Sequence, residues 1–336
     1  MTGLLRVELS RLRSRRAVAV LVLMATLVLG VIAFGVTVNT DRVSDADIAR
    51  AEKQAARDGE RRDYRRSLAQ CVREPESWGV AADTEPAQVR ADCEDAVLPR
   101  VEWYLDANVL DLDEEREFGS GIAVAAFTTV LLFLLGATFA GHDWSTGSMS
   151  NQLLFESRRV RVWSVKALAV VIGAAVVGVV LLSAYWLYLA GVVASRGQPL
   201  DGAVLLDCLQ MGWRSAAFAA AAALGGYVLT MLSRSTVFSL GVVIASFVGG
   251  GLLVVLFGVE VGESLNPVTN AAAVLYDGAT YYVEPPRQCG FPGAPGDLDC
   301  TTERLRTFTQ GFLYYLSVVG VVGAASLLSF RRRDVP

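Results

Sequence analysis

Lysine and histidine are almost absent from this sequence, which contains two lysines, Lys53 and Lys166, and one histidine, His142. The pattern G-x-x-x-x-G-K-[ST] does not occur, so the chain lacks the phosphate-binding loop of an ATPase. A single histidine also excludes a histidine-based metal cluster and a catalytic triad that needs a second histidine. We therefore expect a protein that is not an enzyme and that binds no metal or cofactor of its own.

Charge is missing from the middle of six long apolar runs. Hydrophobic residues make up 53% of the chain, and a helix needs about 20 consecutive apolar residues to cross a hydrocarbon core of roughly 30 Å. Ion-driven carriers place acids or bases inside their spans, so the lack of such residues argues against a carrier of that class. The runs predict an all-α integral membrane protein with six transmembrane helices, at residues 17–38, 120–140, 165–193, 213–232, 237–259 and 311–330.

Arginines predict which side of the membrane each short connection faces, because basic residues near short loops stay cytoplasmic while long loops cross largely regardless of charge. They precede the first run, follow the last one and lie in the link between the second and third, and Arg234 lies between the fourth and fifth. Both termini are therefore expected in the cytoplasm of a multi-pass plasma-membrane protein. Arginine supplies nearly all the basic residues, which with abundant Ala, Val and Gly indicates a GC-rich bacterial genome.

Residues 2–16 are predicted to form an interfacial helix, with Leu5, Leu9 and Leu12 on one face and arginines around the other. A positively charged flank that only orients the first span is a compatible alternative. The first run is expected to remain as a membrane anchor. The expected segments are 1–38 for this helix and the first span, 39–119 for an external helical domain, 120–259 for spans two to five with a cytoplasmic coupling loop at 141–164, 260–310 for an external loop, and 311–336 for the sixth span and tail.

The external segment at residues 39–119 carries 21 acidic and 12 basic residues. One long helix is expected from Asp45 to about Arg73, with Ser44 as its N-cap and Asp47 in the capping-box position. A second helix is expected to begin at residues 84–86, with Pro86 in its first turn. A disordered acidic loop is the alternative.

All five cysteines fall in connections expected outside the cell, where disulfides persist. Cys71 and Cys93 share the first external loop and Cys289 and Cys300 share the last, so each pair is a candidate disulfide. Cys208 is expected in the middle external loop. Unpaired thiols stay open as the alternative, because connectivity does not follow from sequence alone.

Small residues predict that the fourth and fifth spans pack as a tight hairpin. The fourth contains Gly225 and Gly226, the fifth contains glycines at 249–251, and only residues 233–236 join them. Small side chains let membrane helices approach closely. After the fifth span, an apolar run at 271–276 predicts a short helix at the outer leaflet, and the cysteine-bearing segment that follows predicts an irregular loop.

The link at residues 141–166 is the longest segment expected in the cytoplasm, and it carries the candidate site for a partner protein. Met149 and Leu153 share a helix face at i and i+4, which predicts an apolar anchor, and arginines behind them can meet acids or lipid phosphates. A basic loop that merely enforces topology is the alternative. The candidate coupling residues are Asp143, Trp144, Gly147, Ser148, Met149, Leu153, Leu154, Arg158, Arg159, Arg161 and Lys166.

This link resembles that of the type-2 ABC transporter permeases, and most of all the six-span permeases common in actinobacteria. The family pattern has an acid and Trp, then Gly-Thr, leucines, Pro-Arg-Arg and a final Lys. Asp143 stands where Glu is usual, Ser148 where Thr is usual, and Ser157 where Pro is common. The segment at 266–271 is similar to a weaker family feature after the fifth span.

The resemblance implies the permease subunit of a bacterial ABC exporter. Such a subunit pairs with a second copy of itself or a sister permease, and its cytoplasmic link docks on ATP-binding cassette subunits that bind ATP and Mg²⁺. The lipid bilayer is the other expected partner, and no nucleic acid is expected. A membrane sensory or structural protein with the external domain as its receptor remains an alternative, as does a membrane-embedded enzyme.

Overall fold

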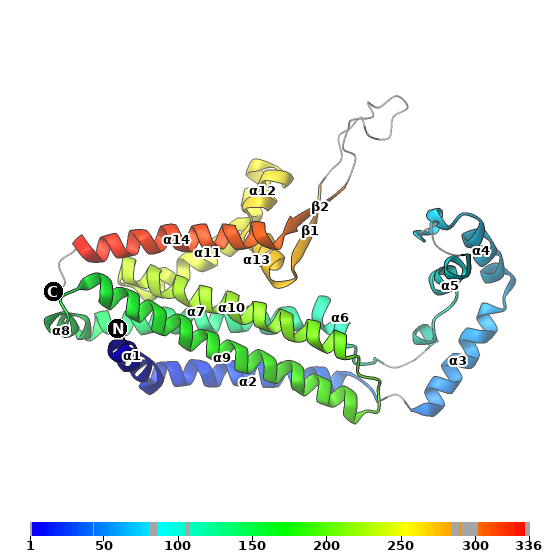
Figure 1. Cartoon of the computed structure of the whole chain (residues 1–336), viewed down its shortest axis with the longest axis horizontal. Helices are drawn as coiled ribbons and strands as arrows, with labels where there is room; N and C mark the ends of the chain where they lie inside the picture. The colour runs from blue at the N-terminus through cyan, green and yellow to red at the C-terminus, as the bar shows by residue number, and fades with distance from the viewer. Residues whose placement is uncertain are drawn as a thin grey trace. The chain divides into compact units, whose positions relative to one another are not determined.

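The computed structural model describes residues 2–42, 44–80, 86–104, 108–283, 289 and 302–332 (Figure 1). The chain divides into two compact units. The bundle unit consists of Met1–Phe34, Leu112–Gly191 and Pro199–Pro336, and the small unit consists of Gly35–Asp111 and Val192–Gln198.

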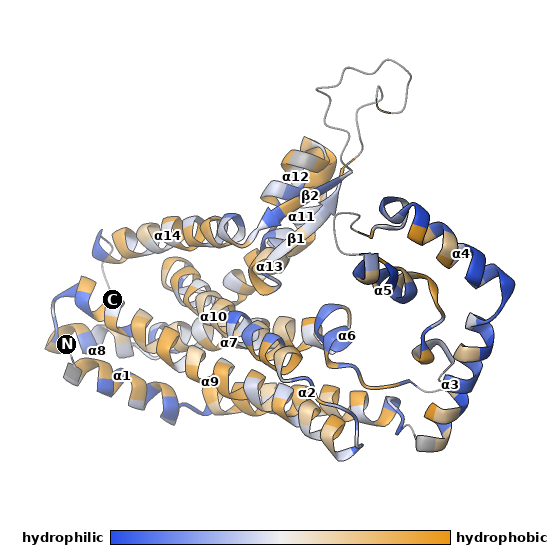
Figure 2. Cartoon of the chain, turned by 45° about the vertical axis from the view of Figure 1, so that its right-hand side comes forward, coloured by the Kyte–Doolittle hydropathy of each residue, from blue (hydrophilic) through white to orange (hydrophobic). Residues whose placement is uncertain are grey.

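Six of the described helices are long and apolar enough to cross a membrane, which confirms the predicted helical multi-pass membrane protein. Hydrophobic residues dominate these helices in Figure 2, whereas hydrophilic residues dominate α3, α4 and α5. The six are α2 (Arg16–Asn39), α7 (Ser120–Ser145) with the short α6 (Leu112–Glu117) before it, α9 (Arg159–Ser195), α10 (Gly202–Ser233), α11 (Thr236–Phe257) and α14 (Phe308–Arg332).

The predicted N-terminal helix is present as α1 (Thr2–Ser14). Leu12 is buried and Leu5 and Leu9 are half-buried, while Arg6 and Arg13 are exposed, as the predicted apolar face requires. Glu8 shares that inward face and is fully buried. A buried acid in a basic helix needs partners, and its partners belong to the candidate site.

The fourth span begins earlier than predicted, at Gly202 rather than residue 213. Asp201 caps the helix, since its side chain accepts a hydrogen bond from the Ala203 N–H at 2.8 Å. The prediction that Cys208 lies in an external loop is therefore wrong. Cys208 is buried within α10, and its thiol donates to the Leu112 carbonyl at 3.5 Å.

α10 and α11 contact each other, as the predicted hairpin requires, but the closest backbone approach of α10 is to α7, the second span. A Cβ on Gly136 of α7 would lie 1.9 Å from the Ala223 carbonyl oxygen, and one on Gly226 of α10 would lie 2.2 Å from that of Phe133. By contrast, a Cβ on Gly249 or Gly251 of α11 would meet nothing within 4 Å. Gly136 and Gly226 therefore allow the backbones of α7 and α10 to approach closely, and α7 is the helix that α10 contacts most extensively.

After α11 the chain forms α12 (Val259–Leu265), α13 (Pro267–Leu275) and an antiparallel hairpin of β1 (Gly278–Tyr282) and β2 (Glu303–Thr307). The predicted short helix is present as α13, but the two strands were not expected. Their register pairs Gly278 with Thr307 and Tyr282 with Glu303. Arg306 of β2 donates to the Asn270 side-chain oxygen at 3.0 Å, which ties the hairpin to α13.

The small unit contains α3 (Asp45–Gly59), α4 (Arg62–Arg73), the 3-10 helix η1 (Pro75–Trp78), α5 (Pro86–Val97) and the 3-10 helix η2 (Val101–Tyr104). The prediction of one helix from Asp45 to Arg73 is wrong, because Arg61 is extended and separates α3 from α4. Glycine at position 59 weakens the helix at this point. The break lets α3 pack on η2 and α4 pack on α5.

Both the predicted cap and the predicted first disulfide are confirmed in the small unit. Ser44 and Asp47 form a reciprocal capping box, and the hydrogen bonds from Ser44 lower the pKa of the Asp47 carboxyl. Cys71 and Cys93 form a disulfide in a small core with Val80, Val89 and Val97. Cys289 is also disulfide-bonded, and its predicted partner, Cys300, lies outside the described residues, as do residues 84 and 85.

Candidate functional site

The link between the second and third spans folds into a short helix, α8 (Ser148–Phe155), set between α7 and α9. Gly147 precedes it with φ of 67°, a left-handed conformation that glycine adopts without the steric cost of a Cβ. The chain then passes through residues 156–158 into α9. Arg159 at the start of α9 donates to the Phe330 carbonyl at 3.2 Å, so the last turn of α14 lies at this same end of the bundle (Figure 1).

Five side chains from α1, the α1–α2 junction, α7, α8 and α9 meet at this end and form what we call the buried ion cluster: Glu8, Arg15, Asp143, Gln152 and Lys166. Lys166 of α9 is central, because its Nζ donates to Glu8 Oε2 at 3.0 Å and to Asp143 Oδ2 at 2.5 Å. Arg15 forms an ion pair with Asp143. Gln152 of α8 donates to Glu8 Oε1 at 2.7 Å.

The cluster is electrically balanced, with two carboxylates facing two cations. Glu8, Asp143 and Lys166 are no more than 1% exposed. Each of these ions, if buried without a partner, would cost several kcal/mol of folding free energy. Ion pairing and hydrogen bonds offset that cost. Arg11 adds a peripheral contact to Glu8 Oε1 at 3.3 Å. The pairing therefore fixes α1 against α7, α8 and α9.

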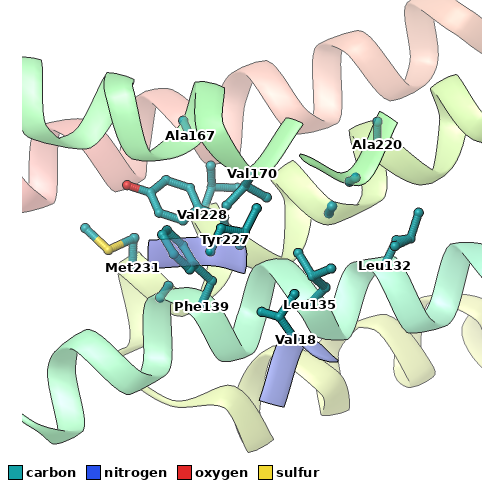
Figure 3. Packing of buried hydrophobic residues seen from close by; sticks show 14 of the residues in the cluster. Val18, Leu132, Leu135, Phe139, Ala167, Val170, Ala220, Tyr227, Val228 and Met231 are labelled. Atoms are coloured by element: carbon teal, nitrogen blue, oxygen red, sulfur yellow. The ribbon is translucent and has the colours of Figure 1, made fainter. Parts of the chain in front are cut away.

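The cluster rests on the apolar core of the bundle. The Arg15 guanidinium lies 4.4 Å from the centre of the Phe139 ring, and Lys166 Nζ lies 5.3 Å from it. Phe139 belongs to the same buried group as Tyr227 and Met231 (Figure 3). The aromatic face stabilises both cations and closes the cluster on its apolar side.

The two faces of α8 have opposite environments. Met149 is 1% exposed and packs in the core together with the half-buried Leu153. The bundle therefore already occupies the face of α8 that was predicted to be an apolar anchor for a partner, Met149 and Leu153. The apolar side chains that α8 presents outward are Leu154 and Phe155, which are 82% and 94% exposed.

The other predicted coupling residues hold the link in place. Ser148 donates to Asp143 Oδ1 at 3.1 Å, across the turn at Gly147. Trp144 packs edge-on against Phe330. The Arg234 guanidinium lies 4.4 Å from the centre of the Trp144 ring.

The three predicted arginines differ in what they contact. Arg161 pairs with Glu156 at 3.1 Å, and Arg159 donates to α14. Arg158 is exposed. Two of the three arginines thus serve contacts within the chain.

Sequence reasoning missed Glu8, Arg15 and Gln152 as members of the site. Glu8 carried a usable signal, since it lies on the same helical face as Leu5 and Leu12 and is the single acid of the N-terminal segment. Lys166, one of two lysines and placed within an apolar run, was the other signal. Neither indicated that the two residues meet.

Each of the four charged groups of the cluster is paired with another, so the cluster ties α1, α7, α8 and α9 together. Among the residues that the structure describes, no group of three His, Cys, Asp or Glu side chains could hold a metal ion. The chain matches no protein-family model, no curated protein and no solved structure.

Proposed function

We propose that this chain is the transmembrane permease subunit of a bacterial ABC exporter, powered by separate ATP-binding cassette subunits. It lies in the plasma membrane with both termini and α8 in the cytoplasm, and it pairs with a second copy or a sister permease. The observation that carries the proposal is the form of α8. Its inner face is bonded into the bundle, while its outer end presents Leu154 and Phe155 almost fully exposed.

An exposed Phe and Leu side by side on a short helix form a small apolar patch that a groove in a partner can bury. Aromatic anchors of this kind contribute much of the energy of protein interfaces. The neighbouring Arg158 is exposed and can face an acidic rim of that groove. The ATPase would thus hold α8 from outside while the bundle holds it from inside.

The buried ion cluster supports a mechanical role for α8. Gln152 and Ser148 of α8 bond to Glu8 and Asp143, and both carboxylates bond to Lys166. A displacement of α8 is therefore passed to α1, α7 and α9 together. When ATP closes the partner subunits, this connection would shift the equilibrium between inward- and outward-facing states.

Co-purification tests the docking assignment. The double variant Leu154→Asp, Phe155→Asp should lose the ATPase partner, whereas wild type and Asn151→Asp should retain it. Asn151 is an exposed residue of the same helix, so it controls for added charge. Both variants should insert into the membrane and unfold at the wild-type temperature. Retention of the ATPase by the double variant would show that α8 is not the docking site.

A second candidate is a membrane sensory or structural protein, because residues of the small unit form a compact body with its own disulfide. In that case an intracellular signalling partner such as a kinase would co-purify in place of a P-loop ATPase. Identification of the proteins that accompany the wild-type chain in mild detergent separates the two functions.

A further inference from the structure

A cavity of about 210 Å³ lies inside the bundle unit, among α7, α10, α11, α14 and the start of α13. Of the helices around it, only α7 also contributes to the buried ion cluster. Phe218 of α10 and Tyr315 of α14 pack edge-on at 4.8 Å in its wall, and Pro267 of α13 also lines it. An engineered apolar cavity of about 150 Å³ accepts a benzene-sized molecule, so this one has room for more.

The polar groups of the lining are already satisfied within the protein. Four hydroxyls line the cavity, and each donates to a backbone carbonyl. A ligand that needs hydrogen bonds gains nothing here, and water would lack the two to four partners that hold it in a buried site. The donors and acceptors are Thr129 to Ala125 at 2.8 Å, Ser246 to Val242 at 2.7 Å, Tyr314 to Leu265 at 3.1 Å and Tyr315 to Pro267 at 2.6 Å.

The cavity borders the lipid side of the bundle. Its walls include α11 and α14, which are the two least buried of the six spans. Both pack on α10, and they make few contacts with each other. The cavity is partly open rather than sealed. A chain from the bilayer can therefore enter between α11 and α14, and α10 forms the floor.

We propose that this cavity binds a hydrocarbon chain of a membrane lipid. The lining offers dispersion contacts and no free hydrogen-bonding group, which selects an alkyl chain over a polar solute. An empty cavity would forfeit those contacts. A bound chain touches α11 and α14 at once, so it joins two spans that scarcely meet otherwise. This inference does not depend on the proposed function, because it requires only that the spans lie in a bilayer.

Glycine positions provide matched variants. Gly225 lines the cavity, and a Cβ added there meets nothing within 4 Å, so Gly225→Leu places its side chain in the cavity without a clash at Cβ. Gly249 of α11 is equally open but lies outside the lining, so Gly249→Leu is the control. Both variants replace glycine by leucine within a transmembrane helix and so share the gain in helix propensity.

The test uses full-length protein in phosphatidylcholine vesicles, with a diazirine near the end of the lipid's acyl chain and, in a second arm, a free fatty acid that carries the same group. After illumination, adducts are mapped by mass spectrometry on the lining residues of α11 and α14. Ordinary bilayer contact is measured on α2, where Val31 and Phe34 are exposed. Labelling of the lining should exceed that of α2. It should fall about tenfold or more in Gly225→Leu, since each displaced methylene contributes several-fold in affinity, and stay unchanged in Gly249→Leu.

Labelling in the phospholipid arm alone identifies a diacyl lipid as the source of the chain. Labelling in the fatty-acid arm alone identifies a free acid. Labelling in both arms shows that the hydrocarbon chain itself is recognised. The proposal is overturned if the lining labels no more than α2 in either arm, or if Gly225→Leu labels as wild type does. Thermal unfolding establishes that each variant is folded. If Gly225→Leu does not fold, Ala222→Leu, in the same lining, replaces it with the same expected loss.

Discussion

Glu8 and Lys166 form a buried ion pair across 158 residues of sequence, with 3.0 Å between Oε2 and Nζ. Lys166 also binds Asp143, and the same Glu8 accepts a hydrogen bond from Gln152. One pair therefore connects the N-terminal helix to the third span and, through Gln152, to α8.

Replacing Lys166 by Met should destabilise the folded chain by about 3–5 kcal/mol, because it removes the cation that two buried carboxylates, Glu8 and Asp143, share. Adding Glu8→Gln to Lys166→Met restores the charge balance and should recover part of the loss. Thermal unfolding in detergent measures both effects. Lys53→Met is the matched control, since Lys53 is the other lysine of the chain and is exposed. Equal stability of the two lysine variants would contradict the assignment.

Truncation of Met149 to Ala should cost about 2–5 kcal/mol of folding free energy, because its side chain is buried in the core of the bundle. Truncation of Leu154 to Ala should change stability by less than about 0.5 kcal/mol, because that side chain is exposed. The two unfolding midpoints, compared in detergent, test which face of α8 packs on the bundle. A larger loss at Leu154 than at Met149 would reverse the orientation of α8 described above.

Gly226→Val should destabilise the bundle by at least about 1–3 kcal/mol, since the added Cβ would lie 2.2 Å from the Phe133 carbonyl oxygen and would force α7 and α10 apart. The neighbouring Gly225→Ala should be neutral or stabilising by up to about 1 kcal/mol, because its Cβ meets open space and alanine favours a helix. Unfolding midpoints of the two variants measure the difference. A neutral effect at position 226 would rule out the close α7–α10 approach.

Removal of the Cys71–Cys93 disulfide by the double variant Cys71→Ser, Cys93→Ser should cost the small unit about 2–5 kcal/mol. Limited proteolysis of the full chain should then cut within residues 44–97 at lower protease concentration than in wild type. Cleavage in the link at residues 146–158 serves as an internal control and should not change. Unaltered resistance of the small unit would show that α4 and α5 hold together without the bridge.

Breaking the Asp58–Tyr104 hydrogen bond should lower a tyrosine pKa. The bond, 2.7 Å from the Tyr104 hydroxyl to Asp58 Oδ2, raises the pKa of Tyr104 to about 12 from its usual 10.0. A raised folded pKa means that this contribution to stability is complete below pH 10 and is lost as the pH rises through 12. In Asp58→Asn the ionisation of Tyr104 should move back toward pH 10, seen as the difference in tyrosinate absorbance between this variant and Asp58→Asn, Tyr104→Phe. An unchanged titration would contradict the bond.

Features that depend on neighbours in the chain were predictable. The six spans, α1, the capping box at Ser44 and the Cys71–Cys93 bridge all follow from composition, spacing or residues within one loop. The predicted helix boundaries were wrong where the local sequence was compatible with more than one start or end of a helix. The helical stretch from Asp45 to Arg73 gave no strong signal for its break near Gly59, and the Asp201 cap of α10 went unrecognised.

Hydrophobicity and charge placement are properties of the chain before it folds, and they suffice to set how many helices cross the membrane and which segments connect them. Which face of each helix turns inward depends on partners that are distant in sequence. Met149 is buried because the bundle covers it, and Gly226 faces α7 because the backbones meet there. Glu8, Arg15, Asp143 and Lys166 are merely flanking charges in the sequence. They become one balanced cluster because α1, α7, α8 and α9 bury Glu8, Asp143 and Lys166, and opposite charges replace the solvation that burial removes.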